Sequence, residues 1–257
     1  MTKQNDEWRR EAAQYEGQMD AVLLIGQSNM CGRGIIGHVP EIPARDMLFM
    51  LRNGHWVPMS EPIQTDRRIY VSSDDQIRCG VSLAASFADD YANRYQRRIG
   101  LIPCADGGTR IDQWQPGEVL FDHAVMQAKL AQRSSRIVGI LWHQGESDSH
   151  HLETVEKYAE RFHYMMNTLK AELQLEEDIP VVIGELSMLL EDRCPYIGQT
   201  NQVLRQLAAE SPHMGIASVE GLTLSPDNIH FSAASYRVLG HRYFEQFDQL
   251  VQKKQQA

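Results

Sequence analysis

Short apolar runs recur along the chain, and their length predicts the strands of a buried sheet. The runs are nearly continuous rather than alternating, which is typical of parallel strands covered on both faces. Each is too short for a helix and stops at a polar or turn-forming segment. The predicted strands are Ala21–Ile25, Met47–Leu51, Ile99–Ile102, Ile137–Trp142, Pro180–Gly184 and Gly215–Val219.

Apolar residues with helical spacing lie between these runs. Leu83, Phe87, Tyr91 and Tyr95 are four apart, and a last amphipathic pattern follows Ser232, a good N-cap. The predicted helices are 82–95, 120–133, 153–173, 195–210 and the segment after 232. Strands that alternate with helices favour βαβ crossovers and a parallel sheet. We therefore expect an α/β fold, a three-layer α/β/α sandwich with a parallel sheet.

The length of the chain fits a single domain. Its 257 residues lie within the range of one α/β unit, so we predict one domain over 1–257, with 1–18 as an N-terminal extension. The segment 52–80 is the least regular part. A loop this long is often a lid or binding loop, so it either shapes the substrate pocket or is an ordinary surface excursion.

The first predicted strand ends in Gly26-Gln27-Ser28-Asn29, the most informative stretch of the chain. In an open α/β sheet, ligands bind at the carboxyl ends of the strands. Small neighbours there let backbone N–H groups approach a substrate. Ser28 is therefore a candidate nucleophile, although a serine that follows a strand can also simply cap a helix.

A base and an acid for this serine occur together near the C-terminus. Asp227 and His230 are three residues apart, on a loop that leads into the last predicted helix. A serine hydroxyl is a weak nucleophile until a neighbouring base takes its proton, and a histidine can do so at neutral pH. A carboxylate on the far ring nitrogen fixes the tautomer. A structural turn with a solvent-facing histidine is the alternative.

Two further strand ends offer donors for an oxyanion. Gln144 follows the strand 137–142 and can donate its side-chain amide N–H. Gly107 or Gly108 follows the strand 99–102 and can present a backbone N–H. Four polar segments with complementary roles, each at a predicted strand end or loop, favour a catalytic site over coincidence.

Other residues near these segments allow competing interpretations. Glu146 and Asp148 either hold their loop or assist His230 if Asp227 does not. Together with His143, His150 and His151 they suggest a metal site, but their spacing enforces no coordination geometry, so we expect no metal and no cofactor. Arg110 and Trp114 can line a sugar subsite, with core packing as the alternative for Trp114.

The cysteines have neither a C-x-x-C motif nor zinc-like spacing, so we expect free thiols at Cys31, Cys79, Cys104 and Cys194. A nucleophilic Cys31 or Cys104 is a weaker alternative to Ser28. A net charge of −9 argues against a nucleic-acid partner. The chain has no apolar run of membrane-spanning length and no signal-peptide core, which predicts a cytoplasmic protein with no membrane partner. The oligomeric state is not predicted.

The motifs resemble those of SGNH hydrolases, and among these the sialate O-acetylesterase-like carbohydrate acetylesterases of carbohydrate esterase family six. The blocks that carry the resemblance are 26–30 with 32–34 behind it, 106–109, 142–148 and 227–231, in the family's order. This subfamily has Gln144 where the wider group has Asn. Cys31 stands where a small residue such as Ala is expected, and Cys is itself small and often buried.

The resemblance implies an SGNH-hydrolase, flavodoxin-like architecture and a Ser28–His230–Asp227 triad without a cofactor. The oxyanion donors it implies are Ser28 N–H, Gly107 N–H and the Gln144 amide; Gly107 is chosen because the family's glycine precedes an x-Thr pair. Substrate-binding or supporting roles are expected for Gln27, Asn29, Arg33, Gly108, Arg110, Trp114 and Glu146.

The implied reaction is removal of O-acetyl groups from a small or oligomeric carbohydrate by a serine esterase, through an acetyl-enzyme. Two alternatives stay open. One is hydrolysis of a non-sugar ester or thioester, and the other is an inactive carbohydrate-binding protein on the same scaffold. The sequence leaves the identity of the sugar open.

Overall fold

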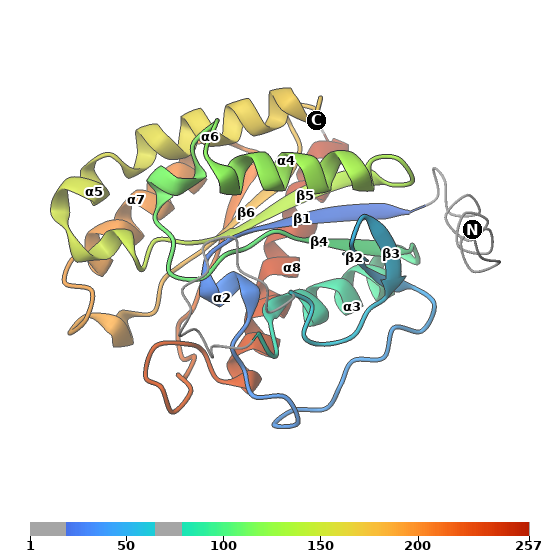
Figure 1. Cartoon of the computed structure of the whole chain (residues 1–257), viewed down its shortest axis with the longest axis horizontal. Coiled ribbons are helices and arrows are strands. Elements are labelled where there is room, and N and C mark those ends of the chain that lie inside the picture. The colour runs from blue at the N-terminus through green and yellow to red at the C-terminus, as the bar shows by residue number, and fades with distance from the viewer. Residues whose placement is uncertain (1–18, 65–78, 257) are drawn as a thin grey trace.

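The computed structural model describes residues 19–64 and 79–256. The expected N-terminal extension 1–18 and residues 65–78 of the irregular segment lie outside the described residues. The chain folds around a seven-stranded sheet with the order β3-β2-β4-β1-β5-β6-β7 (Figure 1). The strands are β1 Asp20–Gly26, β2 Leu48–Arg52, β3 His55–Pro58, β4 Ile99–Pro103, β5 Arg136–His143, β6 Val181–Gly184 and β7 Met214–Ala217.

Strand β1 lies at the centre, parallel to β4 on one side and to β5 on the other. Its register places Leu24 beside Pro103 and Gly26 beside His143, so three carboxyl ends lie side by side. Only β3 runs antiparallel, and it pairs with β2 at the edge.

Helices cover both faces of the sheet (Figure 1). The longer ones are α3 Leu83–Tyr95, α4 Val119–Ala131, α6 Tyr158–Glu172, α7 Ile197–Glu210 and α8 Ala233–Gln256. The short ones are α2 Ser28–Cys31 and α5 Leu152–Glu156, with single 3₁₀ turns at η1 Ile111–Trp114, η2 Asp148–His150 and η3 Met188–Leu190. None of the described helices is long and apolar enough to cross a bilayer.

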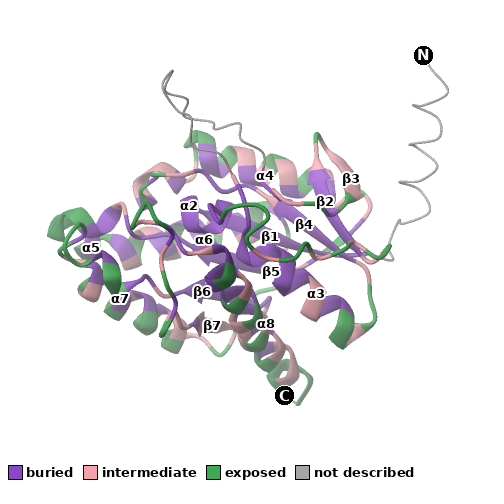
Figure 2. Cartoon of the chain, turned by 90° about the horizontal axis from the view of Figure 1, so that it is seen from below, coloured by how far each residue is buried: buried purple, intermediate pink, exposed green. Residues whose placement is uncertain are grey.

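Successive side chains of β1 enter two separate cores, as the two-residue period of a strand requires. Ala21, Leu23 and Ile25 pack against α4, α6 and α7, whereas Val22 and Leu24 pack against α3 and α8. In Figure 2 the central strands are buried, the edge strand β3 is only half-buried, and the exposed residues lie on the outer faces of the helices and in the loops. A layer of helices on each face confirms the expected α/β/α sandwich.

The predicted strands and helices are found, with two corrections. The sheet is not wholly parallel, because the unpredicted β3 forms a hairpin with β2. Asn53 and Gly54 join these strands with φ of +50° and +76°, the left-handed conformation that a tight hairpin turn requires. The expected helix 153–173 is divided into α5 and α6 at Lys157. Ser232 caps α8 as expected, accepting from the N–H of Ser235 at 3.2 Å.

Candidate active site

The polar segments that follow β1, β4 and β5 are joined by backbone hydrogen bonds just beyond the strand ends. The N–H of Asp106 donates to the Gly26 carbonyl at 3.0 Å, and the N–H of Gln27 donates to the His143 carbonyl at 2.9 Å. The loops that carry Gly107, Ser28 and Gln144 therefore meet at one edge of the sheet, where ligands bind in open α/β folds.

Ser28 begins the short helix α2 directly after this junction. The chain turns at Gly26, whose φ of +135° and close approach to the His143 carbonyl exclude any side chain. Gln27 is the N-cap, so Ser28 is the first helical residue and not the cap. Ser28 is only 7% exposed. No backbone carbonyl of a described residue accepts a hydrogen bond from its N–H.

Asp227 and His230 are joined within one turn. His230 Nδ1 lies 2.7 Å from Asp227 Oδ2, and Asp227 Oδ1 accepts from the N–H groups of Ile229 and His230 at 2.9 and 3.0 Å. Partial burial alone would raise the pKa of Asp227, but the hydrogen bonds from the His230 backbone and ring and from Ile229 lower it. The ionised carboxylate requires Nδ1 to be the donor, which leaves the lone pair on Nε2.

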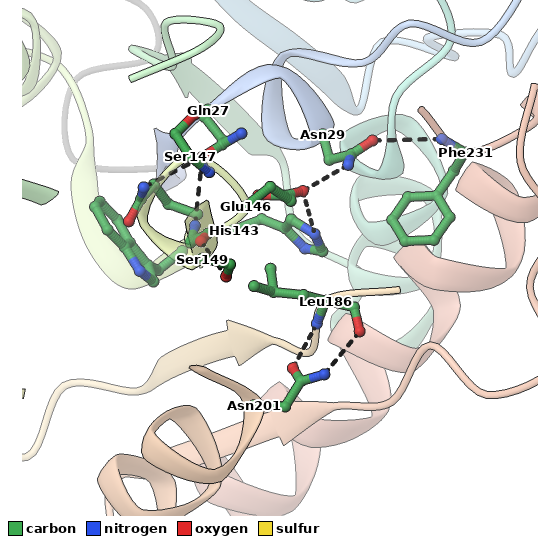
Figure 3. A network of polar contacts seen from close by, with 12 residues as sticks. Gln27, Asn29, His143, Glu146, Ser147, Ser149, Leu186, Asn201 and Phe231 are labelled. Atoms are coloured by element: carbon green, nitrogen blue, oxygen red, sulfur yellow. Dashed lines mark hydrogen bonds and ion pairs between the residues drawn. The ribbon is translucent and has the colours of Figure 1, made fainter. Parts of the chain in front are cut away.

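Asn29 connects the short helix α2 to this C-terminal loop (Figure 3). Its Oδ1 accepts from the Tyr236 hydroxyl at 2.6 Å and from the N–H of Phe231 at 3.4 Å. Its Nδ2 donates to Glu146 Oε1 at 2.6 Å. Because Asn29 follows Ser28 and Phe231 follows His230, this amide joins the two chain segments that carry the expected nucleophile and base.

The loop after β4 that carries Gly107 and Gly108, here called the glycine loop, adjoins the segment of Ser28 and is partly open to solvent. Gly107 is half-buried and Gly108 is exposed, with a φ of +74° that favours glycine. No described residue accepts a backbone hydrogen bond from the N–H of Gly107. Since Asp106 is bonded to Gly26, two residues before Ser28, the N–H groups of Gly107 and Ser28 belong to adjoining segments.

The expected oxyanion role of Gln144 is not supported by its position. The side chain is fully buried, and its Nε2 donates to Asp148 Oδ2 at 2.5 Å and to the Thr109 carbonyl at 2.9 Å, with Gln27 Oε1 at 3.2 Å. An amide has two N–H groups, so none is left for a substrate. We therefore correct this assignment. The hydrogen bonds of the Gln144 side chain hold the glycine loop against the loop after β5.

Tyr158 fixes the orientation of that amide, and sequence analysis missed it. Its hydroxyl is 2.8 Å from both Gln144 Oε1 and the Gln144 carbonyl. The hydroxyl has one hydrogen for these two oxygens, whereas only acceptors surround Nε2, and together they leave a single orientation for the amide. Tyr158 directly follows the break between α5 and α6, which a continuous helical pattern hides.

Trp114 is not available to a sugar. It is 1% exposed, its Nε1 donates to Thr109 Oγ1 at 3.1 Å, and its ring packs edge-on against Trp142. The packing alternative is therefore correct for Trp114. Arg110 is exposed and pairs with Asp112 at 3.0 Å, so its contact with a substrate stays a prediction.

Gln27 and Arg33 each retain a polar group beyond their protein contacts. Gln27 Oε1 lies 3.3–3.4 Å from the N–H groups of Gly145 and Ser147, whereas no described residue accepts from its Nε2. Arg33 donates through one terminal nitrogen to the Gly32 carbonyl and to Cys79 Sγ, both at 3.1 Å. A substrate contact from either side chain stays a prediction.

Glu146 and Asp148 contact other partners than His230. Glu146 accepts a hydrogen bond from the Asn29 amide. Asp148 accepts hydrogen bonds from the Gln144 amide and, at 3.0 Å, from the N–H of Ile111. Burial raises the pKa of Glu146, opposed by the hydrogen bond from Asn29. Burial raises the pKa of Asp148 to about 6, opposed by the hydrogen bonds from Gln144 and Ile111. Neither acid is hydrogen-bonded to the base, and Asp227 is.

The alternative nucleophiles are poorly suited to attack. Cys31 and Cys104 are buried free thiols. A hydrogen bond to Cys79 and burial raise the pKa of Cys31, and burial raises that of Cys104. Thiols that stay protonated are weak nucleophiles. Among residues 19–64 and 79–256, no three His, Cys, Asp or Glu side chains are grouped so that they can hold a metal ion.

A known protein family matches most of this chain. A family model described as "Carbohydrate esterase, sialic acid-specific acetylesterase" matches residues 18–249. The chain belongs to this family. It is accordingly a carboxylic ester hydrolase, and the resemblance that the motifs indicated is confirmed. The match extends from the start of β1 into the last helix, so it includes every block discussed above.

Relatives of this esterase family are found in sequence and in structure. A protein of Arabidopsis thaliana named "Probable carbohydrate esterase At4g34215" is 28% identical over 236 residues, covering 85% of this chain and 86% of the relative. A solved structure from that locus has a TM-score of 0.77 and 26% identity, covering 89% of this chain and 97% of that one. The structure of NanS has a TM-score of 0.71 at 16% identity, covering 93% and 99%, and supports the fold alone.

Proposed function

We propose that the protein is a serine esterase that removes O-acetyl groups from an acetylated carbohydrate. The observation that carries this proposal is the junction at the strand ends. Ser28 begins a helix there, Asn29 connects it to Phe231, and the preceding His230 is hydrogen-bonded to Asp227 at 2.7 Å. A nucleophile, a base and an orienting acid on adjoining segments are the parts that acyl transfer requires.

In the first step, His230 Nε2 takes the proton of the Ser28 hydroxyl as Oγ attacks the acetyl carbonyl carbon. The Asp227 carboxylate stabilises the imidazolium that forms. The tetrahedral intermediate collapses, His230 returns the proton to the sugar oxygen, and the C–O bond to the sugar breaks. The acetyl group is then held as an ester of Ser28.

In the second step, water replaces the sugar. His230 takes a proton from the water, whose oxygen attacks the acetyl carbon, and the proton then passes to Ser28 Oγ as acetate leaves. Both tetrahedral intermediates carry a negative oxygen. We assign its stabilisation to the N–H groups of Ser28 and Gly107, neither of which donates a backbone hydrogen bond to a described residue. Gln144 contributes indirectly, by holding the Thr109 carbonyl and with it the glycine loop.

The substrate class follows from the family, whose description specifies acetyl esters of a sugar acid. The surroundings of Ser28 agree with a polar substrate. Gln27 Nε2, Arg110 and the exposed Gly108 offer hydrogen-bonding groups on the segments that follow β1 and β4, and the buried Arg33 adds a cation shortly after α2. We propose that these groups contact the sugar, while the acetyl group lies between Ser28 and the glycine loop.

The test is acetate release from a panel of O-acetylated sugars, with p-nitrophenyl esters of increasing acyl length alongside. We expect acetyl esters to be hydrolysed far faster than long-chain esters. We also expect Ser28→Ala to lose at least about 10³-fold in kcat while keeping its circular dichroism spectrum. Preference for long acyl chains or thioesters would support the non-sugar alternative. Sugar binding without any turnover would support the inactive scaffold.

A further inference from the structure

A buried acid–base pair, Glu146 with His143, is not used by the proposed mechanism. Glu146 and His143 are 6% and 0% exposed, and His143 Nε2 lies 3.8 Å from Glu146 Oε1 (Figure 3). Both side chains keep an atom that has no hydrogen-bond partner, His143 Nε2 and Glu146 Oε2. Buried polar atoms are almost always partnered, so two orphans in one pair require an explanation.

The hydrogen-bond pattern fixes the tautomer of His143. The hydroxyl of Tyr243 donates to the Trp142 carbonyl at 2.9 Å, which uses its only hydrogen. His143 Nδ1, 2.9 Å from the same hydroxyl, must then be the donor. Gly184 on the neighbouring strand makes room for this pair, because a side chain there would collide with both Nδ1 and the hydroxyl. The neutral ring therefore presents a bare lone pair on Nε2 to Glu146.

Within the described part of the chain, Glu146 has no cationic partner. Among the described residues, no lysine or arginine lies within ion-pair distance of its carboxyl group. Burial lowers the pKa of His143 to about 3, so His143 is neutral near pH 7. Five other titratable groups interact electrostatically with Glu146, and none of them is a cation at that pH. They are Asp148, Tyr158, Cys194, Tyr236 and Tyr243. An ionised carboxylate here would be a buried charge with the Asn29 amide as a hydrogen-bond donor but no cation, and burial without a cation favours the neutral form.

We infer that Glu146 carries a proton in the working enzyme and, in this neutral form, is the positioning residue that orients Asn29 and so aligns Ser28 with the His230 loop. Its Oε1 accepts from Asn29 Nδ2 at 2.6 Å. This contact turns Oδ1 of Asn29 toward the Phe231 N–H and the Tyr236 hydroxyl. His143 Nε2, an acceptor without a hydrogen-bond partner, lies 3.8 Å from Oε1, so a small movement of either side chain lets the protonated carboxyl group donate to it.

This inference has a sharp consequence for substitution by glutamine. Glutamine reproduces a protonated carboxyl group, because its Oε1 can accept from Asn29 and its NH₂ can donate to His143. It does not reproduce a carboxylate, which only accepts. We expect E146Q to keep kcat within about threefold of the wild type. We expect E146A to lose about 10²-fold in kcat with a smaller change in KM, because a displaced nucleophile harms the reaction more than binding.

Infrared difference spectroscopy tests the proton directly. The wild-type spectrum near pH 7 should contain a protonated-carboxyl C=O band that is missing from E146Q. E185Q is the matched control, since Glu185 directly follows β6 but is paired with Arg205 at 2.7 Å. This control should keep both the band and the activity.

The kinetic arm rests on the proposed esterase function, whereas the infrared arm does not, so the two can fail separately. A wild-type protein without esterase activity would refute the proposed function and leave the band to decide the protonation of Glu146. The inference is overturned if E146Q is as inactive as E146A, or if the wild type and E146Q have the same carboxyl bands. Should E146A fail to fold, E146Q and the spectrum still decide.

Discussion

Buried carboxyl groups at the two ends of the central strand β1 have different kinds of partner. At the amino end, the Asp20 carboxylate is 1% exposed and is held by Arg97 at 2.5 Å, Arg136 at 3.1 Å and the Tyr91 hydroxyl at 2.8 Å. Beyond the carboxyl end, Glu146 and Asp148 are just as buried, and no described lysine or arginine lies within ion-pair distance of either. Their partners are the amides of Asn29 and Gln144.

This difference separates stability from function within one sheet. Breaking a buried ion pair leaves an uncompensated charge, so Asp20 and its arginines secure the fold. Acids that are buried without cations have raised pKa values, which is typical of functional sites. We therefore expect substitutions at the amino end to lower stability, and substitutions at the carboxyl end to change catalysis or its dependence on pH.

The largest effect is expected at Asp227. Asp227→Asn removes the carboxylate that fixes the His230 tautomer, so kcat should fall about 10⁴-fold. The side chain of Asp227 is 44% exposed, so the melting temperature should change little. Steady-state kinetics and thermal unfolding measure both quantities on one preparation. A large loss of stability with little loss of kcat would reverse the proposed division between the two ends.

Asp20→Asn should have the opposite signature. The substitution leaves Arg97 and Arg136 without a carboxylate, and because both arginines are partly exposed we expect a loss of about 2–3 kcal/mol in the free energy of unfolding. Denaturant titration measures this loss. Asp112→Asn, which breaks an exposed pair with Arg110, is the control and should cost less than about 1 kcal/mol. The comparison fails if Asp20→Asn lowers kcat per folded molecule and leaves stability intact.

A smaller effect is expected in the pH dependence of stability. Burial raises the pKa of Asp148 to about 6, above its value of about 3.9 in an unfolded chain. The native state thus binds this proton more tightly, and its contribution to the free energy of unfolding declines by about 2 kcal/mol as pH rises from 4 to 6. Asp148→Asn should remove this decline. Parallel stability–pH profiles of the wild type and Asp148→Asn between pH 4 and 6 would contradict the assignment.

The fold was predictable from the sequence because its signals are local. A run such as Ala21–Ile25 is too short and too apolar to be anything but a buried strand, and β1 extends it by one residue at each end. The hairpin of β2 and β3 was missed although Asn53-Gly54 is a strong turn signal, because β3 is short, half-buried and ends in Pro58. The break at Lys157 has no such signal.

The site was predictable in part, for the same physical reason. Asp227 and His230 lie on one turn, so their hydrogen bond follows from spacing alone. The position of Gln144 depends on Tyr158, Thr109 and Asp148, which only the folded chain brings around it. Asn29 likewise bonds to Glu146 and Tyr236, 117 and 207 residues away. Motifs identify these residues, but which atom faces the substrate is decided by partners remote in sequence.

The central claim is that Ser28 forms the covalent bond, and mass spectrometry after fluorophosphonate treatment tests it most directly. We predict a single adduct on the peptide that contains Ser28, loss of esterase activity in step with labelling, and no adduct in Ser28→Ala. Slower labelling of Asp227→Asn would tie the reactivity of Ser28 to the His230 pair. An adduct elsewhere, or a folded Ser28→Ala variant that still releases acetate at the wild-type rate, would contradict the account.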